Sequence, residues 1–201
     1  TLPVLSAGQI WFLDSSDPAA LAISSFDPLT LVEGPRTPLT AEALAALGVD
    51  ADTLHRLEGV RGRMFADGER VYLPLDTSQV DESSRVVAIE RGHGRVAWRW
   101  TGLPGCLLDR IGARDGLVVV FERSALVGRL SILGNRGDAR ATFELAVLAS
   151  APGWPDGFGG EAVPDPVVLT DKDGAPRLLC IALDPARPRF QLDLSRVDFV
   201  F

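Results

Sequence analysis

Cysteine, histidine and lysine are scarce in this chain of 201 residues, which has two cysteines, two histidines and one lysine, Lys172. Cys106 and Cys180 stand far apart, without a CxxC partner or a nearby histidine pair, so the ligand spacing of a zinc site is missing. Cys180 lies in an apolar run and is expected to be a small core residue. A disulfide with Cys106 is the alternative, and it requires an oxidising compartment. The sequence predicts no metal site and no cofactor.

A net positive charge and long hydrophobic runs are also missing. The net charge is −7, so the chain lacks the excess of basic residues that binding to a nucleic-acid backbone requires. Nucleic acid is therefore not expected as a partner. The longest apolar runs, at Leu117–Phe121 and Leu178–Leu183, have the length of strands, so no membrane span is predicted. The first residue is Thr1, which indicates either a removed N-terminal piece, by export or processing, or a part of a longer chain.

A pattern of short strands recurs along the chain. Between residues 67 and 100, strands at Arg70–Leu75, Arg85–Glu90 and Arg95–Trp100 follow one another through a polar loop and a glycine turn. We interpret the chain as four such units, at about 1–34, 61–101, 106–146 and 161–196, with a period in the forties once an inserted segment is set aside. In the first unit the last strand is predicted at Leu31-Val32. In the fourth, Val167 is taken as equivalent to Ile10.

Four strands per unit at this period are typical of a β-propeller blade. The predicted fold is therefore all-β, a propeller of about four blades, each a four-stranded antiparallel sheet. Strands that are apolar on both faces, such as LVVVF at 117–121, fit sheets that bury each other's faces. Trp98 and Trp100 are expected to lock adjacent blades. The four blades are either a complete small propeller or a part of a larger one.

Residues 35–60 interrupt the repeat and predict a short helical insert. Thr40 and Gly48 have the positions of an N-cap and a C-terminal stop, and a second helix is predicted at 52–59. Helices this short need a surface to dock on, either their own propeller or a partner. Trp11 and Trp154 are candidate surface anchors, Trp154 in a Gly- and Pro-rich connection being the stronger. The predicted partner-binding residues are Leu44, Leu47, Leu54, Leu57 and Trp154.

Other candidate chemistry is weaker. Asp50 and Asp52 lack the glycine and distal glutamate of an EF-hand, and a hairpin turn explains the DKDG sequence at 171–174. His55 fits a partly exposed helix residue. Five carboxylates in equivalent loops of the first two units would share one rim and form a site for a cation or a basic partner, although solvated loops explain them as well: Asp14, Asp17, Asp76, Asp81 and Glu82.

One stretch, VVAIERGHGRVAWRW at 86–100, closely resembles the repeat of PQQ-like (quinoprotein-like) propellers, in which an apolar strand ends in an acidic residue and a Gly turn leads to a strand with Trp. DPLTLVEG and ILGNRGDARATFEL are weaker versions. Enzymes of that superfamily add quinone and calcium ligands, a catalytic aspartate and vicinal cysteines, none of which is matched here. The resemblance thus implies the non-catalytic type, similar to outer-membrane assembly lipoproteins and other scaffolds, with a periplasmic or otherwise extracytoplasmic location.

Two functions follow as hypotheses. The first is a non-enzymatic propeller that serves as a scaffold or accessory subunit and binds a protein partner through its loops and the insert. The alternative is a ligand-binding or enzymatic propeller with a site in the central channel. The first predicts an apolar patch on a rim or edge, and the second predicts polar or titratable side chains that converge on the channel mouth.

Overall fold

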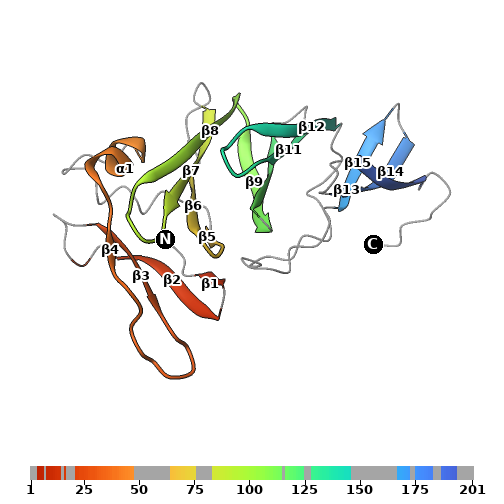
Figure 1. Ribbon diagram of the computed structural model, residues 1–201. Coiled ribbons are helices and arrows are strands. Elements are labelled where there is room, and N and C mark those ends of the chain that lie inside the picture. Colours follow the sequence, from red (N-terminus) through yellow and green to blue (C-terminus); the bar gives the residue numbers. More distant parts are fainter. Residues whose placement is uncertain are drawn as a thin grey trace.

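The computed structural model describes residues 4–6, 8–14, 16, 21–47, 64–75, 83–114, 116–124, 128–145, 167–172, 175–182 and 187–193. In these residues the chain is mostly β-strand, with four antiparallel sheets and one short helix (Figure 1). Three of the sheets have four strands and the fourth has three. The predicted all-β class, with antiparallel blade-like sheets, is confirmed.

The strands of each sheet follow one another in sequence order. The first sheet holds β1 (Val4–Ser6), β2 (Gln9–Asp14), β3 (Ala22–Phe26) and β4 (Thr37–Pro38). The second holds β5 (Phe65–Ala66), β6 (Arg70–Leu75), β7 (Ser83–Glu90) and β8 (Val96–Pro104). The third holds β9 (Leu107–Arg114), β10 (Leu117–Arg123), β11 (Gly128–Leu133) and β12 (Ala139–Leu145). The fourth holds β13 (Val167–Lys172), β14 (Ala175–Ala182) and β15 (Arg187–Asp193).

Tight hairpins connect the first and second strands of the sheets. Two residues separate the paired ends of β1 and β2, and likewise of β9 and β10. Gly8 and Gly116 occupy these turns with φ of 72° and 73°, a conformation that costs glycine nothing and other residues about 1–2 kcal/mol. The sequence thus places glycine where the hairpin needs it.

The first three sheets stack face against face. Their first strands, β1, β5 and β9, lie next to one another. One cluster of buried side chains fills the space between the first and second sheets, with Trp11 and Ile23 on one side and Val71 and Ile89 on the other. Because a single sheet cannot bury both of its faces, this stacking explains why its strands are apolar on both sides.

Trp98 lies between the second and third sheets. It is 7% exposed and belongs to a cluster that joins Tyr72 of β6 to Val118 and Val120 of β10. The Tyr72 and Trp98 rings have centroids 5.8 Å apart. A Cβ atom at Gly137 would lie 2.8 Å from the Trp98 ring, so this ring rests on the β11–β12 turn. The prediction that Trp98 locks adjacent sheets is confirmed.

The helix α1 (Ala41–Ala46) was expected from its N-cap. The Thr40 hydroxyl accepts a hydrogen bond from the Ala43 amide, as the sequence predicts. Buried Ala43 and Ala46 belong to the cluster between the first and second sheets. The predicted second helix at 52–59 lies outside the described residues. The described part of the insert therefore docks on its own propeller.

One prediction about the strands is wrong. Leu31-Val32 is not a strand, and the fourth strand of the first sheet is β4, inside the residues predicted as insert. Leu39 and Leu21 extend the pairing of β3 with β4 by a backbone hydrogen bond, which shows how this edge is completed. In the fourth sheet, the pairing of β14 with β15 shifts register after Cys180, as the pairings of the third and fourth strands do in the second and third sheets. The equivalence of Val167 with Ile10 stays a prediction.

Candidate functional site

The described residues predicted to bind a partner lie in α1 and just after it. Leu47 is 7% exposed and belongs to the cluster between the first and second sheets. Leu44 is partly buried and packs against the same cluster. The chain's own sheets therefore cover Leu47, as the alternative of docking on the propeller requires. Leu54, Leu57 and Trp154 lie outside the described residues. The insert residues that the structure describes offer no large apolar side chain with an open surface.

Trp11, predicted as a surface anchor, is buried. Its exposed fraction is 2%, and the Arg91 guanidinium lies 3.7 Å from the centroid of its ring. β2 places the indole on the face that the second sheet covers. The prediction of a surface role is wrong because a strand's sequence does not tell which of two apolar faces meets a neighbour.

The predicted rim of carboxylates is represented by Asp14 alone, since Asp17, Asp76, Asp81 and Glu82 lie outside the described residues. Asp14 accepts a hydrogen bond from the Ser16 amide at 2.9 Å and from Arg36 Nε at 2.8 Å. Hydrogen bonds from Ser16 and then Arg36 hold the pKa of this carboxyl well below its usual range. Within the described part of the chain, no three His, Cys, Asp or Glu side chains gather as metal ligands.

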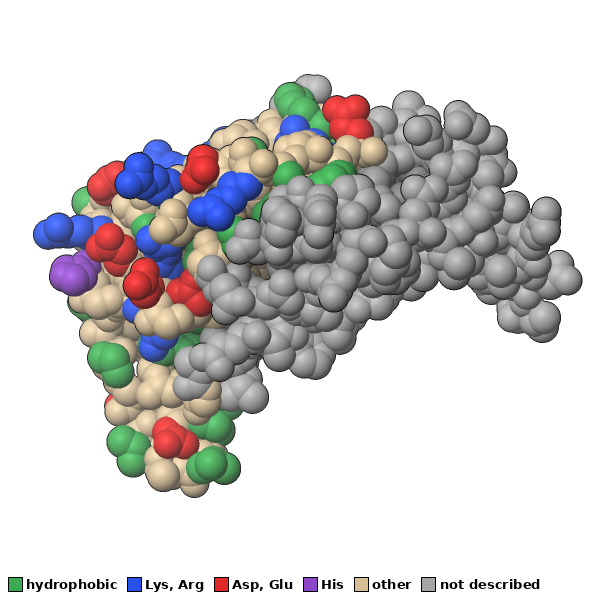
Figure 2. Space-filling model, turned by 45° about the vertical axis from the view of Figure 1, so that its right-hand side comes forward, with side chains coloured by type: hydrophobic (Ala, Val, Ile, Leu, Met, Phe, Trp, Pro, Cys, Tyr) green, Lys and Arg blue, Asp and Glu red, His purple; other side chains and the backbone are tan. Residues whose placement is uncertain are grey.

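The most exposed apolar side chains lie together in the loop between β3 and β4. Leu29, Leu31 and Val32 are 93%, 74% and 62% exposed. In Figure 1 this loop extends from the first sheet at the lower end of the molecule, and in Figure 2 hydrophobic side chains surround an acidic one there. We call Leu29, Leu31 and Val32 the apolar tip. Single exposed apolar residues are ordinary on protein surfaces, but three within four positions form a patch.

Hydrogen bonds hold the loop of the apolar tip in one shape. Asp27 N donates to Val32 O at 2.9 Å, and Leu31 N donates to Asp27 O at 2.8 Å. The Asp27 carboxylate accepts the amides of Leu29 at 2.8 Å and Thr30 at 3.2 Å. These amides, Leu29 first, lower the pKa of Asp27. The apolar side chains are thus presented on a defined frame.

Leu31 adopts a left-handed backbone conformation. Its φ of 57° makes it the one non-glycine residue with positive φ in the described part of the chain. This conformation costs a side chain with a Cβ about 1–2 kcal/mol, and glycine or asparagine would avoid most of that cost. Exposure of a leucine is a second feature that folding does not require. Strain of this kind collects at functional positions, so it marks the apolar tip as a candidate site.

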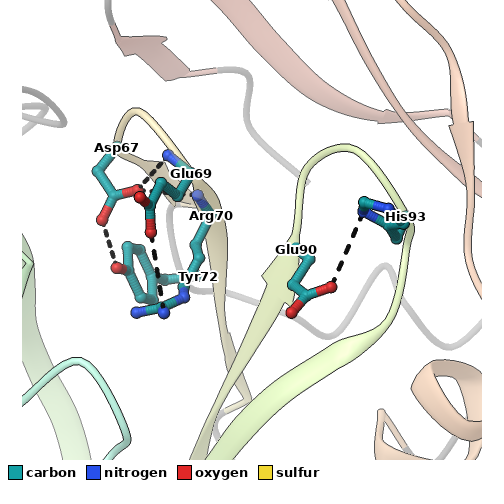
Figure 3. Close-up of polar contacts among 6 residues, drawn as sticks. All are labelled: Asp67, Glu69, Arg70, Tyr72, Glu90 and His93. Atoms are coloured by element: carbon teal, nitrogen blue, oxygen red, sulfur yellow. Dashed lines mark hydrogen bonds and ion pairs between the residues drawn. The ribbon is translucent and has the colours of Figure 1, made fainter.

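A second polar cluster lies at two turns of the second sheet (Figure 3). Asp67 accepts the Tyr72 hydroxyl at 2.5 Å and the amides of Glu69 and Arg70 at 2.8 Å each. Burial raises the pKa of Tyr72, and the hydrogen bond and negative charge of Asp67 raise it further. In the neighbouring turn, His93 and Glu90 are 3.9 Å apart and well exposed. The hydrogen bonds that the Asp67 carboxylate accepts come from residues of its own turn and the strand after it, which favours a structural role for Asp67.

A buried ion pair of the third sheet lies at the junction with the second sheet. Glu122, fully buried on β10, lies 2.6 Å from Arg129 Nη2 and accepts the Leu103 amide of β8 at 3.1 Å. Burial raises the pKa of Glu122, while the Leu103 amide and Arg129 oppose the rise. Gly102 leaves the space that the carboxylate occupies. Burial also raises the pKa of the free thiol of Cys106 nearby. The hydrogen bond from the Leu103 amide to Glu122 joins the second and third sheets.

Comparison with known proteins supports the fold alone. No protein-family model matches the chain, and no curated protein matches it. Among solved structures, a europium-containing methanol dehydrogenase aligns with 96% of this chain at 11% identity and a TM-score of 0.53. A quinohemoprotein alcohol dehydrogenase from Comamonas testosteroni aligns with 94% at 11% identity and a TM-score of 0.51. The chain spans only 41% and 34% of the lengths of those proteins.

The fold class is thus propeller-like, of the type seen in the PQQ-dependent alcohol dehydrogenases. At this identity the likeness carries no activity, ligand or partner to the present chain. Among the described residues, no helix is long and apolar enough to cross a membrane.

Sequence reasoning missed the apolar tip. The sequence predicts a turn at residues 27–30, which contains Leu29, and a strand at Leu31-Val32. In the structure Leu31 has a positive φ, which does not fit a strand. A leucine inside a turn has no sheet face to occupy.

Proposed function

We propose that this chain is a non-enzymatic propeller module, a scaffold or accessory subunit, that binds a protein partner through the apolar tip of the β3–β4 loop. The observation that carries the proposal is the exposure of Leu29, Leu31 and Val32 on a loop that hydrogen bonds hold in one shape. An ordered loop loses little conformational entropy on binding, so its apolar area converts more fully into affinity.

The tip has the chemistry of an anchor for an apolar pocket. Large aliphatic side chains that enter such a pocket lose their contact with water and contribute about 25 cal/mol for each Å² buried. The polar frame behind them, Asp27 and Thr30, is already satisfied by the loop's own amides. A partner therefore has to satisfy few polar groups when it covers the tip. An extracytoplasmic location, implied by the resemblance, stays a prediction.

Site-specific photo-crosslinking tests this function. A benzophenone side chain would replace Leu31 in one variant and Leu107, which is 52% exposed on the third sheet, in the control. In the cells that make the protein, light should yield a discrete adduct from position 31 and none from position 107. Leu29→Ser with Val32→Thr should abolish the adduct at position 31.

Equal adducts from both positions, or none from position 31, would contradict the proposal. An adduct that persists in the Leu29→Ser, Val32→Thr background would show that the tip is near a partner without binding it. The alternative function, a ligand site in the channel, predicts no dependence of ligand binding on these tip variants.

A further inference from the structure

The loop of the apolar tip carries negative charge at its base. The segment DPLTLVE, from Asp27 to Glu33, contains two carboxylates and no basic residue. Phe26 and Glu33 form a β-bridge where the loop leaves the first sheet, and Asp27 comes directly after this bridge. Both carboxylates therefore belong to the base of the loop, and the three apolar residues of the tip lie between them in the chain.

The charge of these two carboxylates is not cancelled within the loop. Asp27 accepts the amides of Leu29 and Thr30, which are neutral donors and leave the negative charge in place. The same amides, Leu29 first, lower the pKa of Asp27, so it is ionised at neutral pH. Glu33 is exposed to solvent. Arg36, the next basic residue along the chain, already binds Asp14 at 2.8 Å.

This charge distinguishes between the two kinds of surface that accept aliphatic side chains, a lipid bilayer and an apolar protein pocket. Segments that lie on membranes carry Lys or Arg beside their apolar residues, and anionic headgroups attract these basic residues. The loop has the opposite charge, so an anionic lipid surface repels it. It also lacks Trp and Tyr, which are enriched at the membrane interface.

We propose that the partner of the apolar tip is a protein whose apolar pocket is rimmed by Lys and Arg side chains. This inference rests on the function proposed above and adds the chemistry of the partner to it. The pocket takes the apolar tip, and basic groups at its rim face Asp27 and Glu33. Complementary charge at a rim speeds the approach of two proteins and excludes competitors of the wrong sign. The net charge of −7 on the whole chain favours a basic partner in the same way.

Charge reversal in the photo-crosslinking assay tests the proposal. In the chain that carries benzophenone at position 31, Glu33→Lys should lower the fraction of chain in the adduct about fivefold, because attraction becomes repulsion. Glu33→Gln only removes the attraction and should lower it about twofold, and it serves as the test if Glu33→Lys disturbs the loop. Glu144→Lys is the matched control. Glu144 is exposed on β12 of the third sheet, so the same change in net charge there should leave the adduct unchanged.

Two further measurements identify the occupant of the tip. Mass spectrometry of the adduct should show a protein segment in which Lys or Arg lies within a few positions of the apolar attachment point. The purified chain should not sediment with vesicles of phosphatidylcholine and phosphatidylglycerol.

The outcomes separate this inference from the proposed function. An adduct that both Glu33 variants leave unchanged, or that Glu144→Lys lowers as much as Glu33→Lys does, would overturn the basic rim and leave the proposed function standing. An attached segment rich in Asp and Glu would do the same. The absence of any adduct from position 31 would overturn both, as would binding to the vesicles that Leu31→Asp abolishes.

Discussion

The connection between the third and fourth strands takes a different form in each of the first three sheets. In the third sheet, Gly137 has a φ of 77° and lies against the Trp98 ring. In the second, Gly94 has a φ of 62° and lies against the Pro38 carbonyl. In the first sheet the residue with positive φ is Leu31, and its side chain is 74% exposed.

The difference separates two kinds of constraint. Gly94 and Gly137 combine a backbone conformation that favours glycine with a close neighbour, so both conditions exclude a side chain. Leu31 has the conformation without the neighbour, and it keeps a large apolar side chain in water at a cost in backbone strain. The turns of the third and second sheets serve the packing of sheets. The loop of the first sheet presents an apolar side chain that the fold itself does not use.

The largest loss of stability is expected when the β11–β12 turn loses the Trp98 ring that packs against it. Trp98→Ala should lower the free energy of unfolding by about 3–5 kcal/mol, because it leaves a cavity between the second and third sheets and removes the ring that rests on Gly137. Chemical denaturation measures this. A loss below about 1 kcal/mol would show that the junction does not depend on the ring.

The next effect is expected from the turn itself. Gly137→Ala should cost about 2–4 kcal/mol, since the new Cβ is strained by the positive φ and would lie 2.8 Å from a buried ring that has no room to shift. The same measurement applies. If Gly137→Ala in the Trp98→Ala background costs as much as it does alone, the contact between turn and ring is not the cause.

A smaller effect, with a defined pH dependence, is expected at the ion pair of the same junction. Burial raises the pKa of Glu122 above its ordinary value of 4.5, so the folded chain holds the proton more tightly than the unfolded chain. Glu122 should therefore lower stability as pH rises from about 4.5 toward its folded pKa.

Glu122→Gln should remove this slope, so the variant gains stability relative to the wild-type chain as pH rises. The amide oxygen still accepts the Leu103 amide, so the contact between the two sheets is kept while the titrating group is removed. Denaturation at a series of pH values measures the difference. Parallel curves for the two chains would show that the folded and unfolded pKa values of Glu122 do not differ.

Much of the fold was predictable because its determinants are local. A glycine turn, alternating apolar residues and the Thr40 cap each specify structure within a few residues, so the hairpins and α1 were expected in place. The faces of the strands were not predictable, since Trp11 has the same alternation whether a sheet or water lies beyond it. Leu31 was predicted in a strand because it is followed by another apolar residue, Val32, and the sequence does not show whether the two meet a sheet or water. Its exposure depends on a loop that extends away from every sheet, which no local pattern encodes.

The smallest effect is expected at the apolar tip, and it tests the central claim most directly. Asparagine tolerates positive φ and is polar, so Leu31→Asn should relieve strain without loss of packing. The measurement is the free energy of unfolding of Leu31→Asn beside that of the wild-type chain. Our account predicts equal stability within about 0.5 kcal/mol, or a gain of up to about 1 kcal/mol. A loss of about 2 kcal/mol or more would show that the leucine supports the chain's own fold, and that the tip is not an element reserved for a partner.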